Sequence, residues 1–214
     1  ISYSNGRMFP STAQYSCLTA EAAIGGNATR KCQADGSWSG AAPTLCKQCG
    51  AVFGSASAGV FAGGDPGDGL DLTGHFLHAV GVYGSGGVTA GDAAFTGDVN
   101  VAGVNVVAQY TRTGWAPRDF GSTPGDNALE HILNSHRWSR HAHGESVSAQ
   151  LGGLTAGDAY RLQLLFSDNG YDRAFDVSVD GLVVFDDFSP NSLDQHNSSL
   201  GAYMSLDFVA CDSI

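Results

Sequence analysis

The chain has 214 residues, a formal net charge of −11 and 30 glycines, and only 14% of its residues are charged. The acidic balance argues against binding to nucleic acid or to anionic lipid, and leaves divalent cations and neutral glycans as candidate partners. No apolar run approaches the ~18–20 residues that span a bilayer, so we expect no membrane insertion. An apolar share of 43% supports a buried core, and the length suggests two folding units.

Residues 1–49 hold four of the five cysteines: Cys17, Cys32, Cys46 and Cys49. The stretch alternates short extended pieces with Gly-rich turns, and so small a unit needs covalent staples to fold. Disulfides form in oxidising surroundings, so we expect an extracellular or cell-surface protein. A zinc site built on Cys46 and Cys49 would need a second pair at similar spacing, which Cys17 and Cys32 do not supply.

Three pieces of this stretch form a specific pattern: Tyr15-Ser16-Cys17, then Cys32-Gln33-Ala34-Asp35-Gly36-Ser37-Trp38, then Pro43 shortly before Cys46. The pattern resembles the second half of a sushi (complement control protein) module. We therefore assign residues 1–49 to a sushi-like module whose N-terminal part is missing.

The sushi family pairs its first cysteine with its third and its second with its fourth, which implies a disulfide between Cys17 and Cys46 here. Cys32 then lacks its family partner. It could pair with a cysteine upstream of this chain, which we favour, or with Cys49, with Cys211 or with another molecule. We therefore expect Cys32 to be unpaired within the pattern or to form an intermolecular disulfide.

From about Ala51 the chain changes to alternating strands separated by Gly-Asp turns. Period-two alternation predicts strands at 75–83, 93–99, 104–110, 145–151, 159–167, 173–179, 182–186 and 201–209. One short helix is expected over Ala128–Leu133, capped by Asp126 and Asn127. Eight strands and one helical turn indicate an all-β fold of the jelly-roll sandwich type.

The stretch from Ala159 to Phe188, AYRLQLLFSDNGYDRAFDVSVDGLVVFDDF, resembles the malectin-like family of jelly rolls. We assign residues 50–214 to a malectin-like β-sandwich. Because the termini of jelly rolls often lie close together, a disulfide between Cys49 and Cys211 is the natural pairing. The resemblance favours sugar binding but identifies the fold better than the ligand.

Three carboxylates, Asp65, Asp68 and Asp71, lie in one Gly-rich loop and could hold calcium, with a solvated acidic turn as the alternative. A second acidic group, Asp168, Asp172, Asp186 and Asp187, could pair with Arg173 or face water. His141 and His143 would share one face of a strand and could bind a transition metal, although two neighbouring arginines oppose a cation.

Aromatic side chains near strand ends or in loops could stack on sugar rings; the candidates are Tyr110, Trp115, Phe120, Trp138 and Tyr171. The alternative is that they cap the ends of the sandwich. Asn27 and Asn197 each begin an Asn-X-Ser/Thr sequon and are candidate glycosylation sites.

The sequence contains no Gly-x-Ser-x-Gly elbow and singles out no carboxylate pair for catalysis, so we do not expect an enzyme. We expect an extracellular structural or adhesive protein, a segment or subunit of a secreted surface assembly or filament, whose partners are other copies or segments of the same protein. The alternative is a carbohydrate-binding module that recognises a glycan at the sandwich loops.

Overall fold

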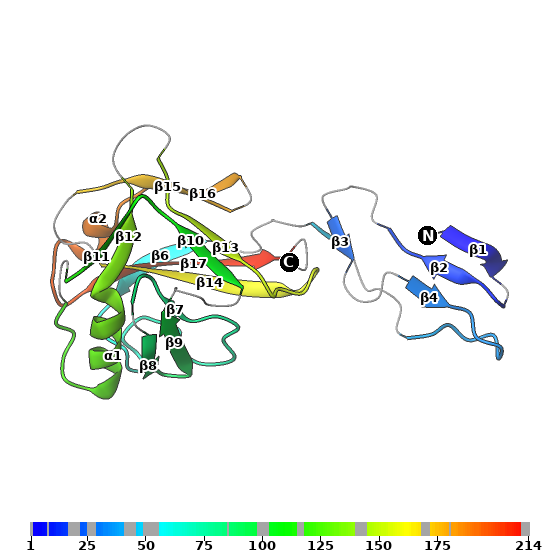
Figure 1. The fold of residues 1–214 in the computed structure, drawn as a ribbon, viewed down its shortest axis with the longest axis horizontal. Coiled ribbons are helices and arrows are strands. Elements are labelled where there is room, and N and C mark those ends of the chain that lie inside the picture. The colour runs from blue at the N-terminus through cyan, green and yellow to red at the C-terminus, as the bar shows by residue number, and fades with distance from the viewer. Residues whose placement is uncertain are drawn as a thin grey trace. The chain divides into compact units, whose positions relative to one another are not determined.

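In a computed structural model, the chain divides into two compact units. Unit 1 comprises Ile1–Ser55, Gly153–Leu162 and Leu206–Ile214, and unit 2 comprises Ala56–Gly152 and Gln163–Ser205. The structure describes residues 2–7, 9–16, 22–24, 29–40, 46–48, 56–84, 86–97, 103–114, 118–139, 145–167, 172–179 and 181–210. The described part is an all-β fold of several small sheets with two short helices (Figure 1).

Unit 1 begins with a three-stranded antiparallel sheet in the order β1-β2-β4 and a two-stranded ribbon, β3 with β5. Its strands are β1 (Ser2–Arg7), β2 (Thr12–Gln14), β3 (Ala22–Ile24), β4 (Thr29–Lys31) and β5 (Cys46–Gln48). Strands β1, β2 and β4 overlap the extended pieces that the sequence predicts at 1–4, 13–17 and 28–32, whereas β3 and β5 lie outside them.

The Asp35-Gly36 turn of unit 1 returns the chain after β4. Gly36 has φ +81°, a left-handed conformation that glycine adopts without steric cost, and the Ser37 N–H donates to Asp35 Oδ1 at 2.9 Å. Cys32 and Trp38 then form an isolated antiparallel bridge. The Trp38 ring lies 5.9 Å from that of Tyr3, and both residues are half-buried, so the two aromatics pack together within the module.

Unit 2 carries most of the remaining strands, and the division between the units passes through β14 and β17. One sheet has the order β14-β17-β6, a second has the order β7-β9-β8, and three ribbons pair β10 with β13, β11 with β12, and β15 with β16. Strands β7 and β9 pair in parallel, whereas β6 with β17, β8 with β9 and the three ribbons are antiparallel. The bounds are β6 (Ser57–Phe61), β7 (Val80–Gly81), β8 (Gly86–Ala90), β9 (Ala93–Gly97), β10 (Val104–Val107), β11 (Tyr110–Thr113), β12 (Ser135–Trp138), β13 (Ser148–Leu151), β14 (Ala159–Phe166), β15 (Phe175–Val179), β16 (Leu182–Phe188) and β17 (Gly201–Val209).

Helix α1 (Pro124–Leu133) covers β8 and supplies one side of the core of unit 2 (Figure 1). Its apolar residues, Ala128, Leu129, Ile132 and Leu133, recur at helical spacing and are all buried. They pack in one cluster with Phe61, Leu72, Ala90, Ala93 and Phe95. This cluster packs the second half of α1 against β6, β8 and β9.

The start of α1 differs from the prediction. Thr123, not Asp126 or Asn127, is the N-cap; its hydroxyl accepts from the Asp126 N–H at 3.1 Å, and Asp126 Oδ2 accepts from the Thr123 N–H at 3.3 Å. This reciprocal capping box, together with Pro124 at the first helical position, begins the helix two residues before Asp126. A second helix, α2 (Pro190–Asp194), was not predicted.

Three strands of unit 2, β6, β8 and β12, lie outside the predicted ranges, and β11 shares only Tyr110 with them. Strand β8 begins with Gly86 and Gly87, both at positive φ, and β12 reads Ser-His-Arg-Trp, so neither shows an apolar alternation. The expected strand at 75–83 is reduced to β7, whereas β17 has the predicted bounds. Neither helix in the described ranges has the length and apolar composition needed to cross a bilayer.

Candidate functional site

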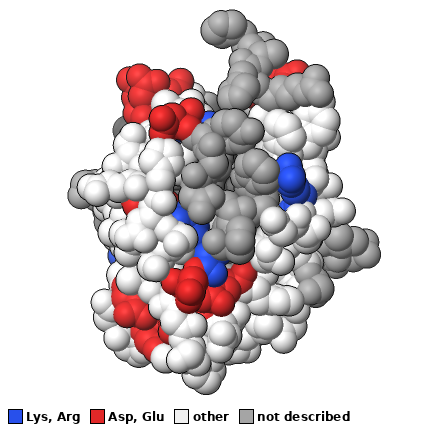
Figure 2. Space-filling model, turned by 90° about the vertical axis from the view of Figure 1, so that its left-hand side faces the viewer, with Lys and Arg blue, Asp and Glu red and all other residues white. Residues whose placement is uncertain are grey.

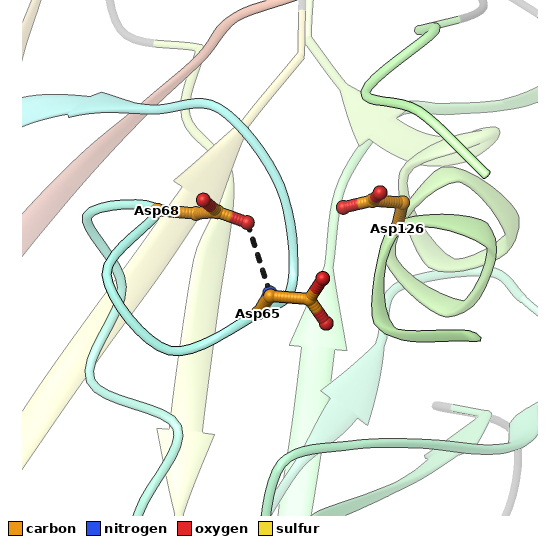
Figure 3. Close-up of side chains that lie close together, drawn as sticks. All are labelled: Asp65, Asp68 and Asp126. Carbon is orange, nitrogen blue, oxygen red and sulfur yellow. Dashed lines mark hydrogen bonds between the residues drawn. The ribbon is translucent and has the colours of Figure 1, made fainter. Parts of the chain in front are cut away.

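Three carboxylates converge where the loop after β6 meets the first turn of α1. Asp65 and Asp68 project from the loop and Asp126 projects from the helix toward them (Figure 3). One oxygen of each lies within 4.8 Å of the others. Asp126 is buried, and Asp65 and Asp68 are half-buried.

Hydrogen bonds within the loop set the positions of two of these carboxylates. Asp68 Oδ2 accepts from the Asp65 N–H at 3.0 Å, and the Asp68 N–H donates to the Asp65 carbonyl at 3.1 Å. Asp126 Oδ1 accepts from the Gly64 N–H at 3.2 Å, which ties the loop to the helix. The capping box of α1 therefore also orients a member of the cluster.

Glycine permits the close approach of loop and helix. A Cβ on Gly63 would lie 2.3 Å from Asp126 Oδ1 and 2.5 Å from Asp68 Oδ2. A Cβ on Gly125 would lie 2.7 Å from Asp65 Oδ1. The acidic oxygens thus occupy space that a side chain at either position would fill.

The pKa of Asp126 lies below its ordinary value. Burial by itself would raise the pKa of this carboxyl, but hydrogen bonds from Thr123 and from the Gly64 N–H favour the charged form and outweigh burial. Because carboxylate oxygens are the ligands that hard cations prefer, Asp65, Asp68 and Asp126 could together hold Ca²⁺.

The set of candidate calcium ligands therefore differs from the predicted set in one residue. The structure brings Asp65 and Asp68 together with Asp126, from 58 residues further along the chain, and not with Asp71. Asp71 Oδ1 instead accepts from the Thr73 hydroxyl at 3.0 Å, and its carbonyl accepts from Gln163 Nε2 at 2.6 Å. The sequence signal for Asp126 is Thr123-x-x-Asp126, which is a helix-capping pattern and carries no direct sign of a cation.

A second acidic cluster lies on the β15–β16 ribbon. Asp176, Asp186 and Asp187 are exposed, with carboxylate oxygens within 4.8 Å of one another. The charges of Asp176 and Asp187 raise the pKa of Asp186. Asp172, predicted with this group, instead lies 3.0 Å from His196, and Asp168 lies outside the described residues.

A buried ion pair that sequence reasoning missed joins distant segments of unit 2. The Arg118 guanidinium donates to Asp194 Oδ2 at 3.0 Å, and both side chains are fully buried. Arg118 also donates to Ser167 Oγ at 2.9 Å and to the carbonyls of Asn197 and Leu200, each at 2.6 Å. No local sequence pattern predicts an ion pair between residues 76 positions apart.

Two of the five glycan-stacking candidates meet across the β11–β12 ribbon. Tyr110 and Trp138 are register partners, and their rings stack at 4.6 Å between centroids and 29° between planes. Trp115 and Tyr171 lie outside the described residues. Phe120 packs on Phe61 at 5.4 Å beside the core of unit 2.

The remaining predicted positions are only partly described. Cys17, Cys49, Cys211, Asn27, His141 and His143 lie outside the described residues, and of Cys46 only the backbone in β5 is described. Because these cysteine side chains are not described, the disulfide assignments remain predictions. Cys32 is buried, at 5% exposure. Asn197 is exposed, and its Oδ1 accepts from the Ser199 N–H at 2.9 Å.

Acidic side chains form separate groups on the face drawn in Figure 2, and much of the described surface between them is uncharged. Comparisons of the chain with protein-family models, with curated proteins and with solved structures each found no match.

Proposed function

We propose that this chain is a segment of an extracellular structural or adhesive protein, in which a sushi-like module precedes a malectin-like sandwich and neither is catalytic. The clustered cysteines of residues 1–49 and the exposed Asn197 sequon support an extracellular setting. The all-β architecture agrees with both resemblances. The partners are other copies or segments of the same protein.

The observation that carries this proposal is how unit 2 uses its buried charges. Arg118 makes four hydrogen bonds, to Ser167, Asp194, Asn197 and Leu200, so its guanidinium is committed to joining loops. Asp126 likewise caps α1 and binds the loop after β6. Buried charges whose hydrogen bonds are satisfied in this way make the module rigid, which suits a structural or adhesive role better than a catalytic one.

The test is the mass of the native material, measured with and without reductant after enzymatic removal of glycans. We expect a large species that reductant converts into separate chains, because intermolecular disulfides would join the subunits. A single 22 kDa species under both conditions would contradict a covalent assembly. Chains much longer than 22 kDa after reduction would support the upstream partner of Cys32.

Carbohydrate binding is the second candidate function, favoured by the stacked pair Tyr110 and Trp138. Both rings are half-buried, so each keeps part of its surface open to solvent, where a sugar ring could stack. We expect Trp138→Ala to abolish glycan binding while far-UV circular dichroism stays unchanged. Unchanged glycan binding by this variant would remove the pair from the function.

A further inference from the structure

One face of the β11–β12 ribbon combines aromatic and basic side chains. In an antiparallel pair, residues directly opposite each other share a face, and so do residues two apart along a strand. The register pairs Tyr110 with Trp138 and Arg112 with His136. These four side chains therefore lie on one face of the ribbon, and Arg137 lies on the other.

A further guanidinium reaches the same aromatic pair. The Arg173 Cζ lies 5.8 Å from the centroid of the Trp138 ring, within range of a cation–π contact. The neighbouring carboxylate of Asp172 lies 3.0 Å from His196 Nε2, so it has a cationic partner of its own when that imidazole is protonated. Arg112 and Arg173 thus flank the stack of Tyr110 on Trp138.

Both strands of the ribbon come from stretches of the chain that lack acidic residues. Positions 99–118 and 131–144 contain none of the 21 aspartates and glutamates, but four of the ten basic residues and four of the seven histidines. Of these basic residues, Arg118 is buried in its pair with Asp194. A chain with net charge −11 would repel a polyanion at long range. At physiological salt, however, charges more than about 8 Å away are largely screened, so the local groups decide the contact.

We propose that this face of the β11–β12 ribbon binds an anionic polysaccharide, with a sugar ring on the Tyr110–Trp138 stack and its carboxylate or sulfate groups on Arg112 and Arg173. Guanidinium groups match the planar, bidentate geometry of such anions. The inference rests on the second candidate function and adds the class of glycan to it. It departs from the neutral glycans that the net charge suggests.

The test measures binding of the purified chain to four polymers: polygalacturonate, a sulfated galactan, dextran and soluble neutral β-glucan. EDTA in the buffer prevents calcium from bridging acidic groups of the protein and the polymer. We expect at least one anionic polymer to bind tenfold or more tightly than either neutral polymer, and its affinity to fall as NaCl rises from 50 to 300 mM. Whether the carboxylated or the sulfated polymer binds identifies the anion.

Arg112→Ala is the decisive variant because Arg112 is exposed. We expect it to weaken binding about two- to fivefold, as an exposed ion pair allows, and Arg112→Glu to weaken it further. Arg137→Ala on the opposite face is the matched control and should leave affinity unchanged. Equal losses for Arg112→Ala and Arg137→Ala would overturn the assignment to this face.

The remaining outcomes separate this inference from the function on which it rests. Equal binding of neutral and anionic polymers would overturn the preference for anions and leave carbohydrate binding intact. Binding of none of the four would contradict both, without bearing on the structural role. Binding of duplex DNA as tight as that of the anionic polymers would show a general polyanion surface and overturn recognition of a sugar.

Discussion

The guanidinium of Arg118 lies 3.0 Å from the carboxylate of Asp194, and solvent reaches neither side chain. Removing one member of such a pair leaves an uncompensated charge in the interior. We expect Arg118→Met to destabilise the protein by about 3–5 kcal/mol, measured as the loss in the free energy of unfolding in urea.

The exposed pair of Arg161 with Asp207 is the matched control for this measurement. Its N–O distance is 2.9 Å, close to that of the buried pair, but its side chains are 55% and 42% exposed. Arg161→Met should therefore cost no more than about 1 kcal/mol. Equal costs for the two arginine substitutions would contradict the anchoring role of Arg118.

Calcium should raise the melting temperature through Asp65, Asp68 and Asp126. A cation that binds only the folded chain stabilises it by about 2.7 kcal/mol when its concentration is 100 times the Kd. We expect the rise in Tm on adding CaCl₂ to disappear in Asp68→Asn and to persist in Asp71→Asn, because Asp71 bonds to Thr73 instead. Differential scanning fluorimetry with CaCl₂, MgCl₂ and EDTA measures this effect.

The calcium experiment has two informative failures. Loss of the effect in Asp71→Asn alone would restore the loop of Asp65, Asp68 and Asp71 as the binding group. No rise in Tm for the unmodified chain would leave the three carboxylates as a capping and loop-closing arrangement.

The pH dependence of stability should report Asp126. Its pKa in the folded chain lies below the ordinary value of 3.8, because hydrogen bonds to the charged form outweigh burial. The stabilisation is therefore complete above about pH 4 and is lost as the pH falls through the lower, folded-state value. We expect Asp126→Asn to be less stable than the unmodified chain at pH 7 and to lose less stability on acidification.

Urea unfolding at pH 7, 5, 4 and 3 measures both parts of this prediction. Asp71→Asn serves again as the control, since it removes an exposed carboxylate from the same region of unit 2. An acid-induced loss as large in Asp126→Asn as in the unmodified chain would assign the pH dependence to other carboxyls.

The sequence predicts those features that a local pattern encodes. Strand β17 alternates buried and half-buried residues over Tyr203–Phe208 and has its predicted bounds, since period-two alternation follows directly from one buried face. The helical segment Ala128–Leu133, which holds the apolar residues of α1 that are buried, is also predicted. Its true beginning was missed because Thr123 and Pro124 precede the apolar residues by a full turn.

The candidate sites depend on contacts between distant positions, which a single sequence does not encode. Asp126 lies in one carboxylate cluster with Asp65, 61 positions earlier in the chain, and Arg118 pairs with Asp194, 76 positions later. The stacking of Tyr110 on Trp138 likewise required the β11–β12 register, because β12 shows no strand pattern of its own. Types of residue were recognisable in the sequence, whereas their partners were not.

Asp186 should behave in the opposite way to Asp126. Repulsion by Asp176 and Asp187 raises the pKa of Asp186, so the folded chain disfavours its charged form. The resulting destabilisation is present above the raised value and is relieved as the pH falls through it. Asp186→Asn should therefore raise Tm at pH 7, with a smaller rise in 1 M NaCl and none at pH 3, where the carboxyl is protonated in both states. Asp207→Asn, which removes the partner of Arg161, is the control and should give no rise in Tm. A fall in Tm for Asp186→Asn would contradict the prediction, because it would mean that a cation or a hydrogen-bond donor stabilises this carboxylate in the folded chain.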